Sequence, residues 1–175
     1  SLGVKSRGRI YEIPKNINYI TARPRMSLYI KKSKEVVNVY LEYVSPEDLH
    51  IYSIDECFLD VTNYMKLYKK TPFELAKDIL NKVYKKTGLC ATAGIGPNML
   101  LTKVCMDTEA KKASNFIAEW TYNDIKTKLW NIDIRKVIGE LVHQRHHQVI
   151  ERYLLPIVLT RFYKAYMLQR ILASN

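Results

Sequence analysis

Residues 52–60 read Tyr-Ser-Ile-Asp-Glu-Cys-Phe-Leu-Asp, so that two carboxylates, Asp55 and Glu56, stand side by side among apolar residues. The flanking stretches, residues 49–54 and 57–62, are rich in β-branched and aromatic side chains, which favour strands. The sequence therefore predicts a β-hairpin with both carboxylates at its bend.

The bend decides what Asp55 and Glu56 can do together. Successive side chains of a straight strand point to opposite faces, so the pair can reach one cation only at a tight turn. Charges among apolar strands are costly to bury unless cations neutralise them. Hard oxygen ligands select Mg²⁺, and two such ions about 3.5 to 4 Å apart support nucleotidyl transfer. An ordinary exposed acidic turn is the alternative interpretation.

Helices and further strands are expected around the hairpin. Apolar residues at helical spacing, with capping residues and Pro or Gly at the ends, predict helices, and short runs of small or β-branched residues predict strands. The expected elements are helices at 33–44, 72–87, 99–111 and 123–130, and strands at 89–95 and 117–120. This order is typical of an α+β domain with helices packed on an antiparallel sheet.

The two ends of the chain differ from this middle part. Residues 1–25 are rich in Gly, Pro and Arg, which indicates a loop-dominated segment. Apolar residues in 133–175 keep a helical period, interrupted at Pro156, and predict a helical C-terminal tail.

Composition narrows the class of protein. The net charge of +11 favours a polyanionic partner such as nucleic acid, an anionic membrane surface or nucleotide phosphates, and a well-solvated surface is the alternative interpretation. The cysteines Cys57, Cys90 and Cys105 follow no metal-binding spacing and are expected to be reduced thiols in the core. With no leader and no apolar run long enough to span a bilayer, we expect a cytoplasmic protein that has no membrane partner.

Two sequence blocks resemble the Y-family of translesion DNA polymerases, particularly its UmuC-like branch. Residues 52–60 are similar to the family's metal-binding block. Residues 92–103, which read Thr-Ala-Gly-Ile-Gly-Pro-Asn-Met-Leu-Leu-Thr-Lys, are similar to a second block, and Asp107 follows where the family has an aspartate. Both blocks occur in the family's order and at about its spacing.

The resemblance implies a catalytic palm at 26–132, preceded by a remnant of the fingers at 1–25 and followed by the helical tail at 133–175. Asp55 and Glu56 would then be catalytic ligands of two Mg²⁺ ions. Lys111 would contact the incoming triphosphate; Lys103 would approach the same site or pair with Asp107 one turn later. The implied partners are primer-template DNA, deoxynucleoside triphosphates and, through regions outside this chain, a sliding clamp.

The chain also departs from the family pattern. The family's first catalytic aspartate and its adjacent steric-gate aromatic are not found in these residues, which predicts that the chain is an inactive fragment of a DNA polymerase that copies damaged template. Two alternatives remain open: a non-catalytic DNA-binding or accessory module that keeps the palm as a scaffold, and a palm enzyme similar to a nucleotide cyclase.

Overall fold

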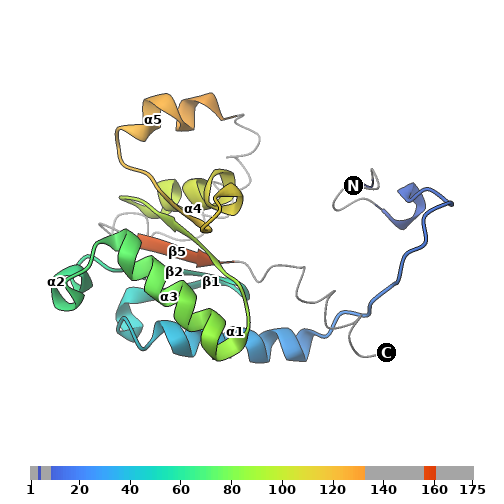
Figure 1. Cartoon of the computed structure of the whole chain (residues 1–175), viewed down its shortest axis with the longest axis horizontal. Coiled ribbons are helices and arrows are strands. Elements are labelled where there is room, and N and C mark those ends of the chain that lie inside the picture. The colour runs from blue at the N-terminus through green and yellow to red at the C-terminus, as the bar shows by residue number, and fades with distance from the viewer. Residues whose placement is uncertain (1–3, 5–8, 133–155, 161–175) are drawn as a thin grey trace.

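The computed structural model describes residues 4, 9–132 and 156–160 (Figure 1). Helices and strands follow each other in a mixed α+β order. The helices are α1 (Met26–Tyr40), α2 (Tyr64–Tyr68), α3 (Pro72–Thr87), α4 (Met99–Thr108) and α5 (Asp124–Thr127), and the strands are β1 (Leu49–Ser53), β2 (Glu56–Asp60), β3 (Thr92–Ile95), β4 (Ile117–Glu119) and β5 (Pro156–Thr160). Single 3-10 turns lie at Ile10–Glu12, Pro46–Asp48, Ala110–Lys112 and Leu129–Asn131.

The strands form one sheet in the order β1-β2-β5-β3-β4. The neighbours β1 and β2, β2 and β5, and β5 and β3 are antiparallel, whereas β3 and β4 run parallel. The predicted hairpin at β1 and β2 is thus confirmed, and so is a largely antiparallel sheet.

Strand β5 corrects the prediction of a helical tail. Residues Pro156–Thr160 pair with β2 on one side and with β3 on the other. The stretch contains Ile157, Val158 and Thr160, which favour extended backbone, and proline is tolerated at the first position of a strand. The rest of the expected tail, residues 133–155 and 161–175, lies outside the described residues.

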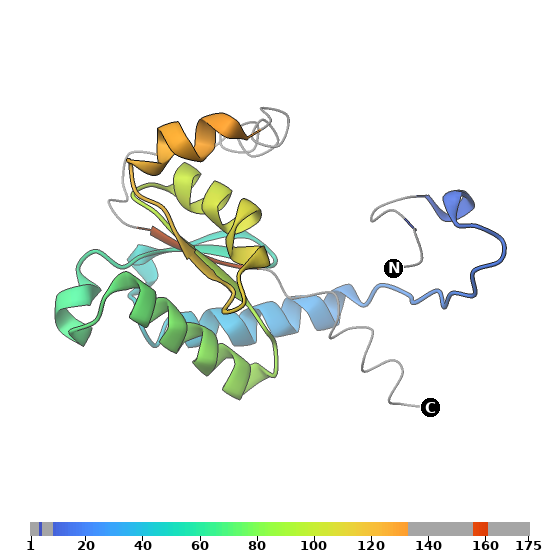
Figure 2. The ribbon, with the colours of Figure 1, turned by 45° about the horizontal axis from the view of Figure 1, so that its top comes forward.

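Helices cover both faces of the sheet (Figure 2). Along β2, Cys57 and Leu59 belong to the core cluster that includes residues of α1 and α3, whereas Phe58 belongs to the cluster built around α4. This alternation follows from the two-residue period of a strand. Glu56 is two residues from Phe58, so it shares the face that α4 covers.

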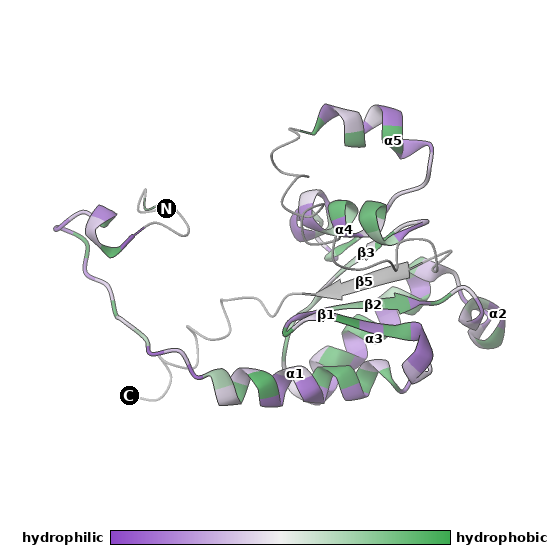
Figure 3. Cartoon of the chain, turned by 180° about the vertical axis from the view of Figure 1, so that it is seen from behind, coloured by the Kyte–Doolittle hydropathy of each residue, from purple (hydrophilic) through white to green (hydrophobic). Residues whose placement is uncertain are grey.

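Helix α3 forms as its sequence predicts. Thr71 caps it by accepting a hydrogen bond from the backbone N–H of Glu74 at 3.2 Å, and the Glu74 carboxylate accepts from the backbone N–H of Thr71 at 2.9 Å. Gly88 ends the helix in the left-handed region at φ 70°. Figure 3 shows hydrophilic and hydrophobic residues interspersed along α1 and α3, as expected for helices that bury one face.

Helix α4 lies unusually close to β3. A Cβ atom at Gly94 would lie 2.4 Å from the carbonyl oxygen of Thr102, so no larger residue fits between strand and helix without a shift. Asn98 begins α4 by accepting a hydrogen bond from the backbone N–H of Leu101 at 2.9 Å. The small residues of the second sequence block therefore bring α4, and the side chains on its inner face, down onto the sheet.

The helices other than α3 differ from the prediction: α4 and α5 end at Thr108 and Thr127, and 3-10 turns follow them where longer helices were expected. Helix α1 begins at Met26 rather than at residue 33, because no Pro or Gly interrupts the stretch ahead of the packed residues Val36 and Val39. The short α2 was not predicted; it is held by Tyr64, whose hydroxyl donates to Asp48 at 2.7 Å and accepts from the backbone N–H of Ser45 at 2.8 Å.

The segment ahead of α1 extends away from the sheet (Figures 1 and 2). Within residues 9–25 the only regular element is the 3-10 turn Ile10–Glu12, as expected for a loop-dominated segment. Among the residues that the structure describes, no helix is both long enough and apolar enough to cross a membrane.

Candidate active site at the turn between β1 and β2

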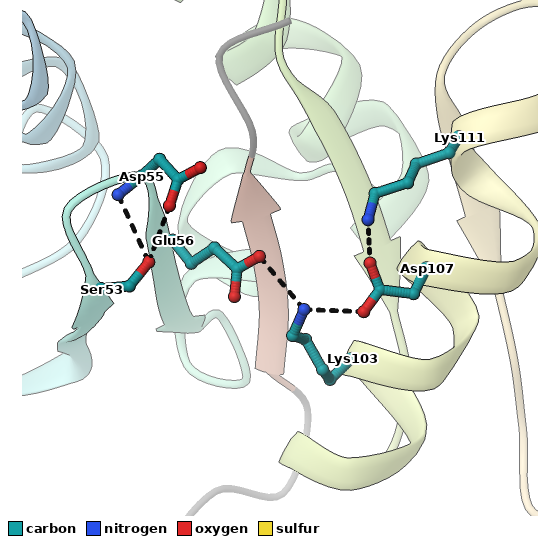
Figure 4. A network of polar contacts seen from close by, with 6 residues as sticks. All are labelled: Ser53, Asp55, Glu56, Lys103, Asp107 and Lys111. Carbon is teal, nitrogen blue, oxygen red and sulfur yellow. Dashed lines mark hydrogen bonds and ion pairs between the residues drawn. The ribbon is translucent and has the colours of Figure 1, made fainter. Parts of the chain in front are cut away.

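A two-residue turn, Ile54 and Asp55, joins β1 to β2, and Ser53 pairs with Glu56 across it. The hydroxyl of Ser53 donates a hydrogen bond to Oδ1 of Asp55 at 2.9 Å, and the backbone N–H of Asp55 approaches the same hydroxyl oxygen at 3.3 Å. These local contacts fix the Asp55 carboxylate at the turn (Figure 4).

Glu56 opens β2 and points across the sheet toward α4 (Figure 4). Its Oε1 lies 3.1 Å from Nζ of Lys103, which comes from the middle of α4. The two side chains are only 12% and 5% exposed, so this is a buried ion pair rather than a surface contact. Buried charges of this kind persist only when they are paired.

Asp107 extends the ion pair into a chain of four alternating charges. Nζ of Lys103 donates to Oδ2 of Asp107 at 2.7 Å, and Lys111 donates to Oδ1 of the same carboxylate (Figure 4). Burial alone would raise the pKa of Asp107, but the charges and hydrogen bonds of Lys103 and Lys111 outweigh it and lower that pKa. The carboxylate is therefore held ionised between two lysines.

Cys57 follows Glu56 in β2 and points to the opposite face of the sheet, which is apolar. Burial, followed by the negative charges of Asp55 and Glu56, raises the pKa of Cys57 to about 12. Burial also raises the pKa of Cys105 to about 12. The prediction of reduced core thiols is confirmed for these two, which are free and buried; for Cys90 the core position is wrong, because this free thiol is exposed.

The structure brings four predicted site residues into one region. Glu56, Lys103 and Lys111 belong to the chain of charges, and Asp55 lies next to Glu56 at the turn. The two carboxylates have different partners, Ser53 for Asp55 and Lys103 for Glu56. Within residues 9–132 and 156–160, no three His, Cys, Asp or Glu side chains gather closely enough to hold a metal ion.

The pairing of Lys103 with Asp107, one of the two expectations for this lysine, is present in the structure. Two other contacts were not expected from the sequence: Ser53 orients Asp55, and Lys111 contacts Asp107. The signal for the second is a spacing of four residues, although α4 ends at Thr108 and Lys111 lies in the 3-10 turn that follows. The contact of Lys103 with Glu56 spans 47 residues, and no local spacing indicates it.

Comparison with known proteins adds the family context. The sequence model of the impB/mucB/samB family matches residues 1–107, a range that includes both blocks and Asp107. The chain is 39% identical over 130 residues to UvrX of Bacillus subtilis (strain 168), which is named for UV-damage repair. It is 35% identical over 146 residues to DNA polymerase IV 2 of the same organism. No solved structure matches the chain.

These matches cover most of this chain but a minor part of the relatives. The aligned residues make up 74% of the chain and 30% of UvrX, and 83% of the chain and 35% of DNA polymerase IV 2. The chain therefore spans about a third of the length of the curated relatives that it matches.

Proposed function

Because the chain belongs to the impB/mucB/samB family, with Y-family DNA polymerases among its relatives, we propose that it is the palm-containing segment of a translesion DNA polymerase. Residues 26–132 would form the palm together with strand β5, which lies within the same sheet, and residues 1–25 would be part of the fingers. The reaction would be template-directed addition of deoxynucleotides opposite damaged bases, by a longer polypeptide that contains this segment.

One observation carries the proposal: a buried, ion-paired glutamate follows an aspartate at a hairpin turn inside the matched region. Asp55 and Glu56 offer carboxylate oxygens, which are the ligands that Mg²⁺ prefers. Protein sites commonly hold Mg²⁺ through one or two carboxylates, with waters and substrate phosphates completing the shell, so a pair of carboxylates fits this ion. When bound, two Mg²⁺ ions would activate the primer 3′-hydroxyl and stabilise the pyrophosphate leaving group.

The lysines supply positive charge next to these carboxylates. Lys111 is 24% exposed and lies at the outer end of the chain of charges, where a triphosphate can reach it by displacing Asp107. Lys103 is more deeply buried and adds to the positive charge of the same region. We assign the triphosphate to Lys111, whose role is to bind and orient the nucleotide, and Lys103 adds positive charge behind it.

The overall charge supports the choice of substrates. A net charge of +11 favours primer-template DNA, whose phosphates attract Lys and Arg side chains. Contact with a sliding clamp would involve regions outside this segment.

Primer extension tests the proposed function. The protein expressed from the complete reading frame should extend a primed template, and Asp55→Ala and Glu56→Ala should each lower the rate by at least about a hundredfold. Asp78→Ala is the matched control, because Asp78 is an acid of α3 that pairs with Lys70, away from the turn. Extension by both site variants at the control rate would refute the assignment.

A non-catalytic DNA-binding or accessory module is the second candidate. It is favoured by the finding that the described residues contain no group of three potential metal ligands. This candidate predicts that the complete protein binds DNA with strong salt dependence but adds no nucleotide. A nucleotide cyclase, the third possibility, would consume triphosphate without any primed template, so the same assay with and without template separates it.

A further inference from the structure

Lys103 carries the most deeply buried charge among the described residues of the site. Its side chain is 5% exposed, and its ammonium group lies between two carboxylates, Glu56 at 3.1 Å and Asp107 at 2.7 Å. Because burial of an unpaired ammonium is strongly unfavourable, these two carboxylates stabilise the charge of Lys103 in its buried position.

Glu56 has the opposite requirement. Its carboxylate is 12% exposed and needs a cation, and in the structure Lys103 provides it. The divalent ion proposed above would provide the same positive charge to the same carboxylate. The ammonium group and the divalent ion therefore compete for Glu56, since one carboxylate oxygen facing Lys103 is less available to a metal.

Asp107 gives Lys103 an alternative ion-pair partner. The contact between Lys103 and Asp107 is shorter than the one between Lys103 and Glu56, and both residues lie on α4 one turn apart. Lys103 can thus release Glu56 and remain paired, without any movement of the helix. Phosphate binding is a poorer explanation for Lys103 itself, because two carboxylates already contact its ammonium group and its side chain is nearly inaccessible.

We propose that Lys103 is a positioning residue that takes the place of the divalent cation at Glu56 when no metal is bound, and that it withdraws onto Asp107 when metal binds. This inference rests on the proposed function, in which Asp55 and Glu56 are the metal ligands. Lys103 keeps the buried carboxylate neutralised and correctly oriented in the metal-free protein, at the cost of a weaker affinity for the metal.

Metal titration of the 175-residue chain tests the competition without relying on catalysis. Mn²⁺ is the probe, and binding is followed by calorimetry and by the unfolding temperature at increasing Mn²⁺, without nucleotide or DNA. Lys103→Gln keeps most of the side-chain length and removes the charge. Its Mn²⁺ dissociation constant should fall on the order of tenfold below that of the wild type, within the usual range for coupled sites. Added Mn²⁺ should also raise its unfolding temperature more than that of the wild type.

Two further variants locate the effect. Lys82→Gln is the matched control, because Lys82 pairs with Glu42 at 2.7 Å on the surface, away from the turn, and its Mn²⁺ affinity should equal that of the wild type. The double variant Glu56→Gln, Lys103→Gln should lose the gain in affinity, because the carboxylate for which the two cations compete is absent.

Each outcome bears on one of the two claims. If Glu56→Gln abolishes Mn²⁺ binding but Lys103→Gln leaves the affinity unchanged, the competition is refuted and the metal site stands. If no variant binds Mn²⁺, or if binding survives Glu56→Gln, the metal site fails and the competition fails with it.

If Lys103→Gln does not fold even with Mn²⁺, the variant Asp107→Asn decides. Lys103 then lacks its second carboxylate and should hold Glu56 more firmly, so the affinity for Mn²⁺ should fall. An unchanged or higher affinity would overturn the proposal.

Discussion

Asp107 receives hydrogen bonds from two lysines that lie one helical turn before and after it, Lys103 on the helix and Lys111 in the short turn beyond its end. Burial opposes its ionisation, yet the two positive charges lower its pKa below the ordinary aspartate value. A group whose pKa is lower in the folded state stabilises the fold at any pH above its unfolded pKa. That contribution is lost as the pH falls through the folded pKa.

We therefore expect Asp107→Asn to destabilise the chain at pH 7 on the order of 2 kcal/mol, as is typical for lost hydrogen bonds to charged groups. The difference from the wild type should persist down to about pH 4, the unfolded aspartate pKa, and shrink at lower pH. Urea unfolding of both proteins at pH 7, 5, 4 and 3 measures it.

The exposed acid Asp78 provides the comparison. Its side chain is 39% exposed and pairs with Lys70 at the surface, so Asp78→Asn should change the free energy of unfolding little at any of these pH values. A difference between Asp107→Asn and the wild type that is as large at pH 3 as at pH 7 would contradict the role given to the Asp107 charge.

Single residues of the site were predictable to different extents. The pair Lys103 and Asp107 follows from helical spacing, and Asp55 with Glu56 follows from the strand residues around them. The partner of Glu56 could not be predicted, because it depends on α4 packing on the face of the sheet to which Glu56 points, and Lys103 lies 47 residues further along the chain. Such a contact is determined by packing between elements rather than by local sequence.

At the level of elements, α3 was the most predictable part of the chain. Its capping threonine, proline in the first turn, apolar stripe and terminal glycine all agree, and the helix occupies Pro72–Thr87 as expected. Because several local signals favour the same helix with the same ends, tertiary packing has no conflicting preference to override.

The cap of α3 gives a prediction of its own. Thr71→Ala removes the hydroxyl that accepts from the backbone N–H of Glu74, and it should lower the free energy of unfolding by about 1 kcal/mol. Thr71→Ser keeps the hydroxyl and should stay near the wild type. Chemical unfolding of the three proteins under one condition compares them, and equal midpoints for Ala and Ser would exclude a stabilising role for the cap.

Strand β5 was the least predictable element. The apolar residues on both sides of Pro156 recur at helical spacing, which favoured a helix. A short apolar run such as 156–160 is compatible with a strand as well as with a helix, so its sequence alone does not decide between them. What makes residues 156–160 a strand is the presence of unpaired edges on β2 and β3, which accept them on both sides. The partner strands β2 and β3 lie about 60 to 100 residues earlier in the sequence, as the paired positions show.

For the whole molecule, β5 connects two parts of the sheet, β1 with β2 and β3 with β4, which share no strand pairing with each other among the residues that the structure describes. A chain that ends at residue 155 should lose on the order of 3 kcal/mol or more of stability, since backbone hydrogen bonds to both β2 and β3 disappear. Backbone amide exchange in β2 and β3 should rise at the same time, as hydrogen-exchange mass spectrometry can measure.

A chain that ends at residue 160 is the control, because it retains Pro156–Thr160. It should be more stable than the chain that ends at 155 by the same amount. If the two shortened chains unfold at the same urea concentration and exchange at the same rate, β5 does not hold the sheet together.

The central place of β5 also matters during translation. The ribosome delivers β1 to β4 first, and the strand that separates β2 from β3 emerges only after residues 120–160 have been made, which takes roughly 2 to 8 seconds at 5 to 20 residues per second. Throughout that interval the nascent chain exposes two open strand edges, which can recruit strands from neighbouring chains. We expect slower translation over this stretch to lengthen the time during which these edges can pair with other chains.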